Sequence, residues 1–377
     1  MINDRNTFKF GNFAENIAKI MQEHPVCDHQ SILENVLAKI KEGPCVIWGS
    51  GSGGHDLHSY LQKFGIHQIE LFCDTYKRGT DQATGIAIIS PEELAEKYKD
   101  ATVIIGVGNP HFYDEICTKI TELNFTGAVM AYHEVMPFLF VSDLLKNTTD
   151  MTVLIEKYGR VWDYFVDDAS RQVLLDWIRL LLFYEPKPSS STQYFDPEII
   201  NLNDKEVFVD GGFYTGDTTE IFIHKTGGHF KHIFGFEPDI SNSALYKPDE
   251  NTNITIVSKG LWSCDDVLFF KQSSHPSTNE ISSDGNIAVP ATSIDNFFEK
   301  NAYTPTFIKM DIEGAEKQAL LGAEKTIKKY KPKLAICVYH KVEDMYELPE
   351  LIRGMNTDYK LYLRNYHEYT ETVLYAI

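Results

Sequence analysis

A glycine-rich segment directly follows an apolar run in the second half of the chain, and an acidic residue ends the next apolar run. The segment reads Asp210-Gly-Gly-Phe-Tyr-Thr-Gly216-Asp-Thr218, and the acid is Glu237. Glycines let a ligand approach the backbone closely, and ligands of open α/β sheets bind beyond the carboxyl ends of the strands. A tight strand-to-helix turn without a ligand has the same composition, so the turn is informative mainly together with Glu237, an acceptor for ribose hydroxyls. The residues predicted to bind a cofactor are Asp210, Gly211, Gly212, Gly216, Thr218, Glu237 and Pro238.

Two carboxylates and a histidine are candidates for acid–base chemistry. Asp311 and Glu313 follow the apolar run 307–310, and His340 follows the run 333–338. Each has a non-catalytic explanation: Asp311 as a helix N-cap, Glu313 as an acid favoured by a helix dipole, and His340 as a loop histidine. We predict that Asp311 orients or deprotonates an acceptor hydroxyl, with His340 as the reserve base and Glu313 as a third candidate. Spacing shows no third ligand beside the two carboxylates, so no metal is predicted.

A second glycine-rich turn lies in the first half of the chain. Gly49, Gly51 and Gly54 have the G-x-G-x-x-G spacing, and Asp74 follows roughly 20 residues on, as in dinucleotide-binding turns. Residues 111–190 contain no evident substrate domain of a dehydrogenase. Two interpretations therefore stay open: a nucleotide or nucleotide-sugar site, or a structural unit that packs on the rest of the chain.

Apolar runs that alternate with helical patterns indicate the elements that position these residues. In the second half, strands are predicted at 206–209, 232–236, 254–258, 307–310, 333–338, 360–364 and 372–375. The last two would form an antiparallel pair after a parallel series. In the first half, strands are predicted at 45–48, 69–73 and 102–107. Both halves therefore read as α/β units.

The segment between the two units has a different pattern. Helical periodicity runs from residue 153 to 183, and the segment 186–191 is rich in Pro and Ser, as linkers are. We therefore predict two Rossmann-like, doubly wound domains at residues 1–145 and 193–377, joined by a helical connector at residues 146–192.

Several segments of the second half together resemble the FkbM-type methyltransferases. They are Glu206-Val-Phe-Val-Asp-Gly-Gly, Phe236-Glu-Pro-Asp239, Phe307-Ile-Lys-Met-Asp-Ile-Glu-Gly-Ala-Glu316, Lys331-Pro-Lys-Leu-Ala-Ile and Glu371-Thr-Val-Leu-Tyr-Ala376. The resemblance covers residues 193–377. It implies a seven-stranded sheet, S-adenosylmethionine as cofactor and methyl donor, and a hydroxyl of a sugar or small metabolite as acceptor. Many relatives have Ala-Asn after the first glycine of the turn, where this chain has Gly212-Phe213-Tyr214, so the resemblance assigns no role to Tyr214.

Charge and composition narrow the classes of partner. The chain has 35 Lys and Arg against 54 Asp and Glu, and its formal net charge of −19 repels nucleic acid and anionic membranes. The six cysteines form no C-x-x-C pair, as is typical of reduced thiols. Residues 1–20 lack the apolar core of a signal peptide. We expect a cytoplasmic enzyme with a small-molecule or sugar acceptor and no nucleic-acid or membrane partner. The sequence is compatible with a homo-oligomer.

Two rival functions remain open. The first is a nicotinamide-dependent sugar-nucleotide oxidoreductase centred on the turn at residues 49–54 and on Asp74. The second is a non-catalytic binding protein that keeps a methyltransferase fold. The first rival predicts binding of NAD, and the second predicts binding of S-adenosylmethionine without turnover.

Overall fold

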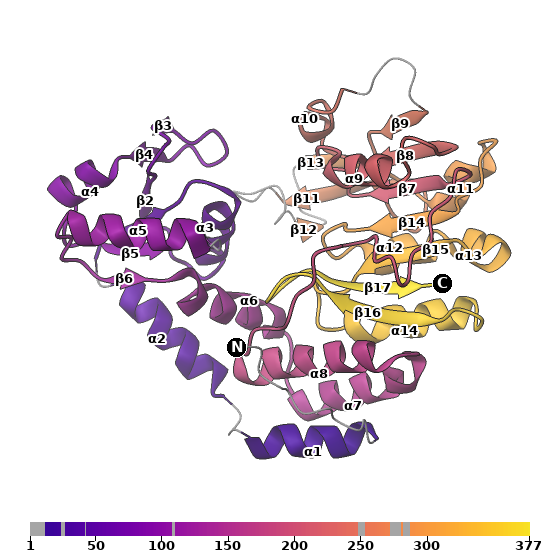
Figure 1. Ribbon diagram of the computed structural model, residues 1–377, viewed down its shortest axis with the longest axis horizontal. Coiled ribbons are helices and arrows are strands. Elements are labelled where there is room, and N and C mark those ends of the chain that lie inside the picture. The colour runs from indigo at the N-terminus through magenta and orange to yellow at the C-terminus, as the bar shows by residue number, and fades with distance from the viewer. Residues whose placement is uncertain are drawn as a thin grey trace. The chain divides into compact units, whose positions relative to one another are not determined.

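The chain forms two compact units in a computed structural model (Figure 1). The structure describes residues 12–23, 27–41, 43–107, 110–247, 253–271, 280–281 and 287–377. Unit 1 takes its residues from Met1–Pro25, Thr148–Lys271 and Ile281–Ile377, and unit 2 from Val26–Asn147 and Gln272–Glu280. Among the described residues, no helix combines the length and the apolar character needed to cross a membrane.

Unit 2 is built on a six-stranded sheet in the order β3-β4-β2-β1-β5-β6. All neighbours are parallel except the pair β3 and β4. The strands are β1 Cys45–Trp48, β2 Ile69–Cys73, β3 Gly79–Thr80, β4 Ala87–Ile89, β5 Thr102–Ile105 and β6 Val129–Met130. The helices are α2 His29–Lys41, α3 Ser52–Lys63, α4 Pro91–Lys97, α5 Pro110–Glu122 and α6 Met136–Leu145, with a short 3₁₀ helix at Tyr132–Glu134. Every residue of β1 and β5 is buried, which explains why these central strands are continuous apolar runs.

Unit 1 contains a seven-stranded sheet in the order β16-β17-β15-β14-β7-β8-β9. Only β17 runs antiparallel to its neighbours. The strands are β7 Val207–Gly211, β8 His232–Phe236, β9 Ile254–Val257, β14 Phe307–Met310, β15 Lys333–Cys337, β16 Leu361–Asn365 and β17 Thr372–Ala376. The predicted α/β class, the seven strands and the closing antiparallel pair are confirmed. Strand order reverses between β7 and β14, and ligands of such sheets bind at this switch point.

Helices complete unit 1. They are α1 Phe13–Glu23, α7 Met151–Val161, α8 Asp168–Phe183, α9 Asp217–Lys225, α10 Ile240–Ser243, α11 Ile294–Glu299, α12 Glu316–Leu321, α13 Glu324–Tyr330 and α14 Asp344–Met355, with a 3₁₀ helix at Trp162–Tyr164. Helix α8 packs on β16, α7 packs on α14, and α1 lies beside α8 (Figure 1). The long helical stretch predicted before the second unit therefore exists as two helices, and both belong to unit 1.

The expected boundary at residue 145 lies close to the division between Asn147 and Thr148, whereas the two units are not divided at residue 192. The Pro- and Ser-rich segment 186–191 has the composition of a linker, yet its backbone is hydrogen-bonded to the last residue of β16 and to the loop that follows this strand. The amide of Lys187 donates to Glu368 O at 2.8 Å, and that of Ser190 donates to Asn365 O at 2.9 Å. The side chain of Lys187 is buried. Sequence composition missed this because the partners lie in strands far along the chain.

A second sheet in the order β10-β13-β11-β12 was not predicted. Its strands are β10 Gly260–Leu261, β11 Asp266–Lys271, β12 Glu280–Ile281 and β13 Ile287–Thr292. Two of these strands have only two residues, and β13 contains Pro290. Val267 and Phe269 on β11 are exposed, so no buried apolar run marks this sheet in the sequence.

Candidate active site

The turn between β7 and α9 packs closely against the end of β14, and two of its glycines make this close approach possible. Gly212 has φ +75°, and a Cβ atom there would lie 1.8 Å from the carbonyl oxygen of Asp311. Gly216, at the N-cap of α9, has φ +84°, and a Cβ atom there would lie 2.4 Å from Cδ2 of Tyr246. Only glycine combines a positive φ with this lack of space, so the turn is fixed by residue type.

A buried lysine on β14 holds this turn from beneath. Nζ of Lys309 donates to Gly211 O at 3.1 Å and to Gly212 O at 2.9 Å, and it lies 3.1 Å from Oδ1 of Asp210. The second carboxylate oxygen of Asp210 accepts a 2.8 Å hydrogen bond from Thr219. Burial opposes the charge of Lys309, but the negative charges of Asp210 and Asp311 outweigh it and raise its pKa.

The predicted direct contact between the Asp210 carboxylate and a cofactor is not supported by this geometry. Asp210 has no exposed surface, and both of its oxygens are engaged by Lys309 and Thr219. Its role in the structure is to position the turn through Lys309. Lys309 was not predicted as a site residue, although a lysine inside the otherwise apolar, fully buried strand β14 was a usable signal.

Glu237 is joined to the same turn, as its place after β8 suggested. Its Oε2 accepts from the amide of Tyr214 at 2.8 Å, and its Oε1 accepts from the amide of Asp239 at 2.9 Å. Burial raises the pKa of Glu237, and these two amides oppose that shift. Each carboxylate oxygen can accept a second hydrogen bond, so Glu237 keeps capacity for a ligand.

The other predicted cofactor residues lie around this turn with unequal accessibility. Gly211 ends β7, and a Cβ atom there would lie 2.8 Å from Cδ1 of Leu261. Thr218 is buried in the first turn of α9, whereas Pro238 is exposed after β8. Pro238 is therefore the exposed member of the predicted set and Gly212 is partly buried, whereas Glu237, like Thr218, is buried.

The three predicted catalytic residues lie together at the ends of β14 and β15. Nε2 of His340 is 3.3 Å from Oδ1 of Asp311 and 3.7 Å from Oε2 of Glu313. Asp311 also accepts a 2.7 Å hydrogen bond from the hydroxyl of Tyr194. Glu313 has φ +55°, an uncommon conformation for a residue with a side chain. The structure thus brings the three predicted catalytic residues to one edge of the sheet.

Their charge states differ from those of ready proton acceptors. Burial opposes ionisation of Asp311, but the hydrogen bond from His340 and the charge of Lys309 hold its pKa below the usual range. Burial opposes the charge of His340, but Glu316 and Asp311 raise its pKa well above the usual value. A strongly acidic carboxyl and a protonated ring are both weak bases at neutral pH. The geometry therefore favours an orienting role for Asp311 over deprotonation.

Of the three predicted catalytic residues, Glu313 has the pKa that lies closest to neutral pH. Desolvation comes first in raising it to about 7, and the charges of Asp311 and Glu316 add to it against the opposing charge of His340. About half of the side chain, 55%, is exposed to solvent, which screens part of this shift.

Sequence reasoning missed the groups that complete this cluster. Glu316, the first residue of α12, is fully buried, and its Oε1 lies 3.0 Å from Nδ1 of His340. The hydroxyl of Tyr339 donates to Glu371 at 3.1 Å and lies 3.4 Å from Asp311. Glu316 stood in the segment that carries the family resemblance, but only the fold brings it against His340.

The first-half turn is also built tightly around its acid. A Cβ atom at Gly54 would lie 1.9 Å from the carbonyl oxygen of Gly49. Oδ2 of Asp74 accepts from the amide and the hydroxyl of Ser50 at 3.0 and 2.7 Å. Its Oδ1 accepts from two backbone amides of the following loop, including that of Tyr76 at 2.9 Å. Asp74 thus serves its own loop, and nucleotide binding by this turn stays a prediction.

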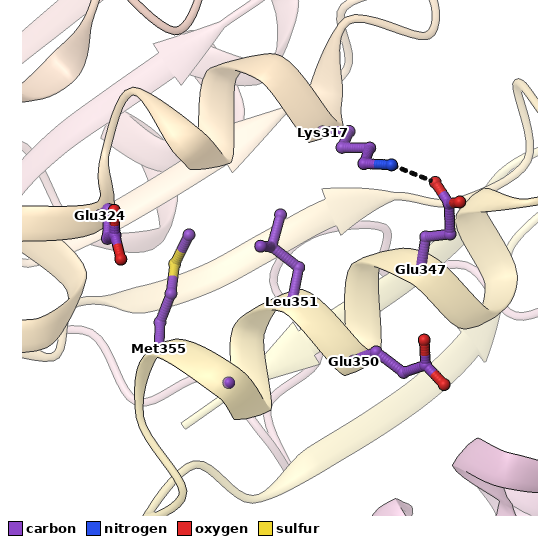
Figure 2. Close-up of a pocket in the computed structure, with 7 residues that line it drawn as sticks. Lys317, Glu324, Glu347, Glu350, Leu351 and Met355 are labelled. Atoms are coloured by element: carbon purple, nitrogen blue, oxygen red, sulfur yellow. Dashed lines mark hydrogen bonds and ion pairs between the residues drawn. The ribbon is translucent and has the colours of Figure 1, made fainter.

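A surface pocket of unit 1 lies along α14 and contains none of the predicted site residues (Figure 2). Glu347 on α14 pairs with Lys317 on α12 at 2.8 Å, and Glu350 follows one turn later. The remaining lining residues are Glu324, Leu351, Gly354 and Met355. The pocket is acidic, and it offers a useful contrast to the cluster at the strand ends.

Comparison with known proteins agrees with the fold. The sequence model of the family described as the methyltransferase FkbM domain matches residues 155–360. The crystal structure of methyltransferase FkbM from Methylobacillus flagellatus KT is similar, with a TM-score of 0.61 and 24% identity, over 97% of this chain and 98% of that one. This likeness shows a shared fold. None of the curated proteins matches this chain.

More distant structures were also found. A putative rRNA-methylase from Clostridium thermocellum has a TM-score of 0.31 and 12% identity, over 46% of this chain and 86% of that one. The complex of LepI with SAM has a TM-score of 0.33 and 9% identity, over 98% of this chain and 95% of that one. Scores this low carry no argument. The family model, in contrast, spans more than half of the chain and begins within α7. The chain therefore belongs to the FkbM methyltransferase family.

Proposed function

We propose that this protein transfers a methyl group from S-adenosylmethionine to a hydroxyl of a sugar or small metabolite. The observation that carries the proposal is the junction of the glycine turn with Glu237, whose carboxylate accepts the amide of Tyr214 at 2.8 Å. This junction lies at the switch in strand order, where α/β sheets bind their ligands. Membership of the FkbM methyltransferase family supports the same chemistry.

In this proposal the donor lies across the turn between β7 and α9. Glu237 accepts hydrogen bonds from the ribose hydroxyls with its remaining lone pairs. The backbone of Gly211, Gly212 and Gly216, with the N-terminus of α9, holds the amino-acid end. Asp210 and Lys309 act from beneath, because Lys309 fixes the carbonyl groups of the turn.

The acceptor hydroxyl lies at Asp311, whose side chain is 23% exposed and whose position is set by Tyr194. Methyl transfer from a sulfonium ion depends mainly on in-line positioning. An ionised Asp311 accepts the hydrogen bond of the hydroxyl and orients its oxygen toward the methyl group. Glu313 and His340 lie beside it, and the Glu313 carboxylate takes the proton that the hydroxyl releases as the new O–C bond forms and the S–C bond of the donor breaks.

The test is formation of S-adenosylhomocysteine from S-adenosylmethionine across a panel of sugars and hydroxylated metabolites. We expect turnover with at least one acceptor, and a loss of about 100-fold or more in kcat for Asp311→Ala, which removes the oxygen that orients the hydroxyl. Full activity of Asp311→Ala would rule out the orienting role. Donor binding without turnover across the whole panel would favour the non-catalytic binding protein instead.

The net charge of the chain supports the proposed class of acceptor, and its cysteines support the proposed cellular location. The net charge of −19 disfavours RNA and DNA as acceptors. All six cysteines are free, which is consistent with the reducing cytoplasm that we propose. Methylation of RNA by the purified protein, measured against the same panel, would contradict this choice of acceptor.

A further inference from the structure

Three side chains at the ends of β14 and β15 have the spacing of metal ligands. The ligand atoms of Asp311, Glu316 and His340 all lie within 4.8 Å of one another. Nδ1 of His340 is 3.0 Å from Oε1 of Glu316, and Nε2 is 3.3 Å from Oδ1 of Asp311. Donor atoms on one small cation are separated by on the order of 3 Å, because bond lengths are about 2.0–2.2 Å. Glu316 and Asp311 face different nitrogens of the ring, so a shared ion would take one nitrogen of His340 and require the other carboxylate to turn toward it.

The most deeply buried of these groups has an unused oxygen. Glu316 has no exposed surface, and among the residues that the structure describes its Oε2 has no hydrogen-bond partner. Its Oε1 accepts from the amide of Ile312 at 2.8 Å and faces His340, so the carboxyl group is turned toward the ring. A buried carboxylate oxygen without a donor is costly unless a cation or proton satisfies it.

Negative charge also exceeds positive charge at this edge. Three carboxylates, those of Asp311, Glu313 and Glu316, lie within 3.7 Å of the ring nitrogens of His340. The buried cation of β14, Lys309, is paired with Asp210. One protonated ring leaves two of the three carboxylate charges unbalanced, whereas a divalent cation beside a neutral ring leaves one.

We propose that Asp311, Glu316 and His340 bind a divalent transition-metal cation of the Mn²⁺ or Zn²⁺ class. One imidazole nitrogen with two carboxylates suits these ions better than Ca²⁺ or Mg²⁺, which take oxygen ligands. Glu313, 3.7 Å from Nε2 of His340 and half exposed, can supply a further oxygen. The sequence spacing showed no third ligand beside Asp311 and Glu313. The fold brings two more ligands to Asp311, namely Glu316 and His340.

The role of this ion rests on the proposed function. The site lies where the acceptor hydroxyl is expected, and a divalent cation there would bind the hydroxyl oxygen and lower its pKa. It would thus activate the hydroxyl at the place where Asp311 orients it. The ion would also fix the acceptor, so its removal should raise KM for the acceptor without changing donor affinity.

The first experiment titrates the chelator-treated, full-length protein with Mn²⁺ alone, following free Mn²⁺ by electron paramagnetic resonance. We expect one ion per chain, and at least tenfold weaker binding in Glu316→Gln and in His340→Gln. The matched control is Glu350→Gln, which removes a carboxylate from the acidic pocket of Figure 2 and should leave the affinity unchanged. No binding at millimolar Mn²⁺, or weaker binding in Glu350→Gln only, would overturn the proposal.

A second measurement needs no variant and so does not depend on how well the variants fold. Pulsed paramagnetic resonance of Mn²⁺ bound to the unaltered chain should show coupling to an imidazole nitrogen. An oxygen-only coordination shell would overturn the proposal. Because neither measurement contains a methyl donor, Mn²⁺ binding without any methyl transfer would contradict the proposed function alone and leave the metal site in place.

Discussion

The two glycine-rich turns of this chain differ in what lies beneath them. Both follow a central parallel strand, and in both an acid from the next strand accepts backbone amides of the turn or loop. In unit 1, buried Lys309 donates to two turn carbonyls and pairs with Asp210. In unit 2, the lysine that donates to a turn carbonyl is Lys77, which bonds Ser50 O at 3.0 Å from an exposed position.

The difference teaches that the shared pattern does not by itself make a site. The unit 1 turn is linked through Asp210 to Lys309 on β14, and the charged pair of Asp311 and His340 lies at the ends of β14 and β15. The family match covers this region. In unit 2 the acid, Asp74, already accepts four hydrogen bonds, two from Ser50 in the glycine turn and two from amides of the loop that follows Asp74. We therefore propose that the chemistry takes place at the unit 1 turn.

The largest expected effect is on Lys309. Lys309→Met leaves Asp210 buried without its ion-pair partner, which should cost about 3–5 kcal/mol of unfolding free energy, measured by urea denaturation. The control is Lys77→Met, which removes the exposed counterpart in unit 2 and should change stability by about 0.5 kcal/mol or less.

A double variant separates stability from function. Lys309→Met with Asp210→Asn removes the unpaired charge and should recover much of the lost stability. It cannot restore the hydrogen bonds to Gly211 O and Gly212 O, so binding of S-adenosylhomocysteine should stay weak. Recovery of both properties would show that Lys309 serves only to balance Asp210.

The next effect compares glycines of the two turns. Gly212→Ala should cost about 1–3 kcal/mol, because its Cβ would meet the carbonyl of Asp311 at 1.8 Å. Gly51→Ala should have little effect, because nothing lies within 4 Å of a Cβ atom there. Gly54→Ala, which meets Gly49 O at 1.9 Å, should destabilise unit 2 and leave donor binding intact. Thermal melts and ligand titration of the three variants check this, and loss of donor binding in Gly54→Ala would contradict it.

A smaller effect is expected at a second buried lysine, which shows what the carboxylate beside Lys309 contributes. Unit 1 holds a second buried lysine, Lys187, which donates to Thr372 at 2.8 Å and to Thr370 O at 3.2 Å and lies over the ring of Trp177. Its pKa is lowered from 10.5 to about 7 by burial, against the opposing charges of Glu371 and Asp176. Burial without a directly paired carboxylate thus has the opposite outcome to that at Lys309.

The pH dependence follows from the sign of this shift. Between pH 7 and 10.5 the unfolded state binds one more proton at Lys187 than the folded state does. The destabilisation caused by this lysine therefore grows as the pH falls from 10.5 to 7. Below pH 7 it stays constant. The free energy of unfolding of Lys187→Met should therefore exceed that of the unaltered chain by less as the pH rises, and this difference should shrink by up to about 1.4 kcal/mol per pH unit. Urea unfolding at pH 7 and at pH 9 measures it, and a constant difference would contradict the low pKa.

Local apolar runs fixed much of the fold in advance. Strands β1, β2, β8 and β14 have the bounds that their apolar residues predicted, because central parallel strands are buried on both faces. The sheet that contains β11 and β13 was missed, because its strands are short and partly exposed. Its pairing depends on partners that no local pattern reveals.

The candidate site was predictable in its acids and glycines but not in its pairings. Asp311, Glu313 and His340 could be placed at one sheet edge because they follow neighbouring strands. Lys309 contacts Asp210 across a separation of 99 residues, so the charge balance of the turn required the fold. The orientation of Glu316 toward His340 likewise depends on the start of α12.

The most direct test of the account is calorimetric titration with S-adenosylmethionine, S-adenosylhomocysteine and NAD of the unaltered chain, Glu237→Ala and Asp74→Ala. We predict micromolar binding of both sulfur ligands, worth about −8 kcal/mol, which Asp74→Ala keeps and Glu237→Ala loses. Binding of NAD that depends on Asp74, without binding of either sulfur ligand, would contradict the account and move the chemistry to unit 2.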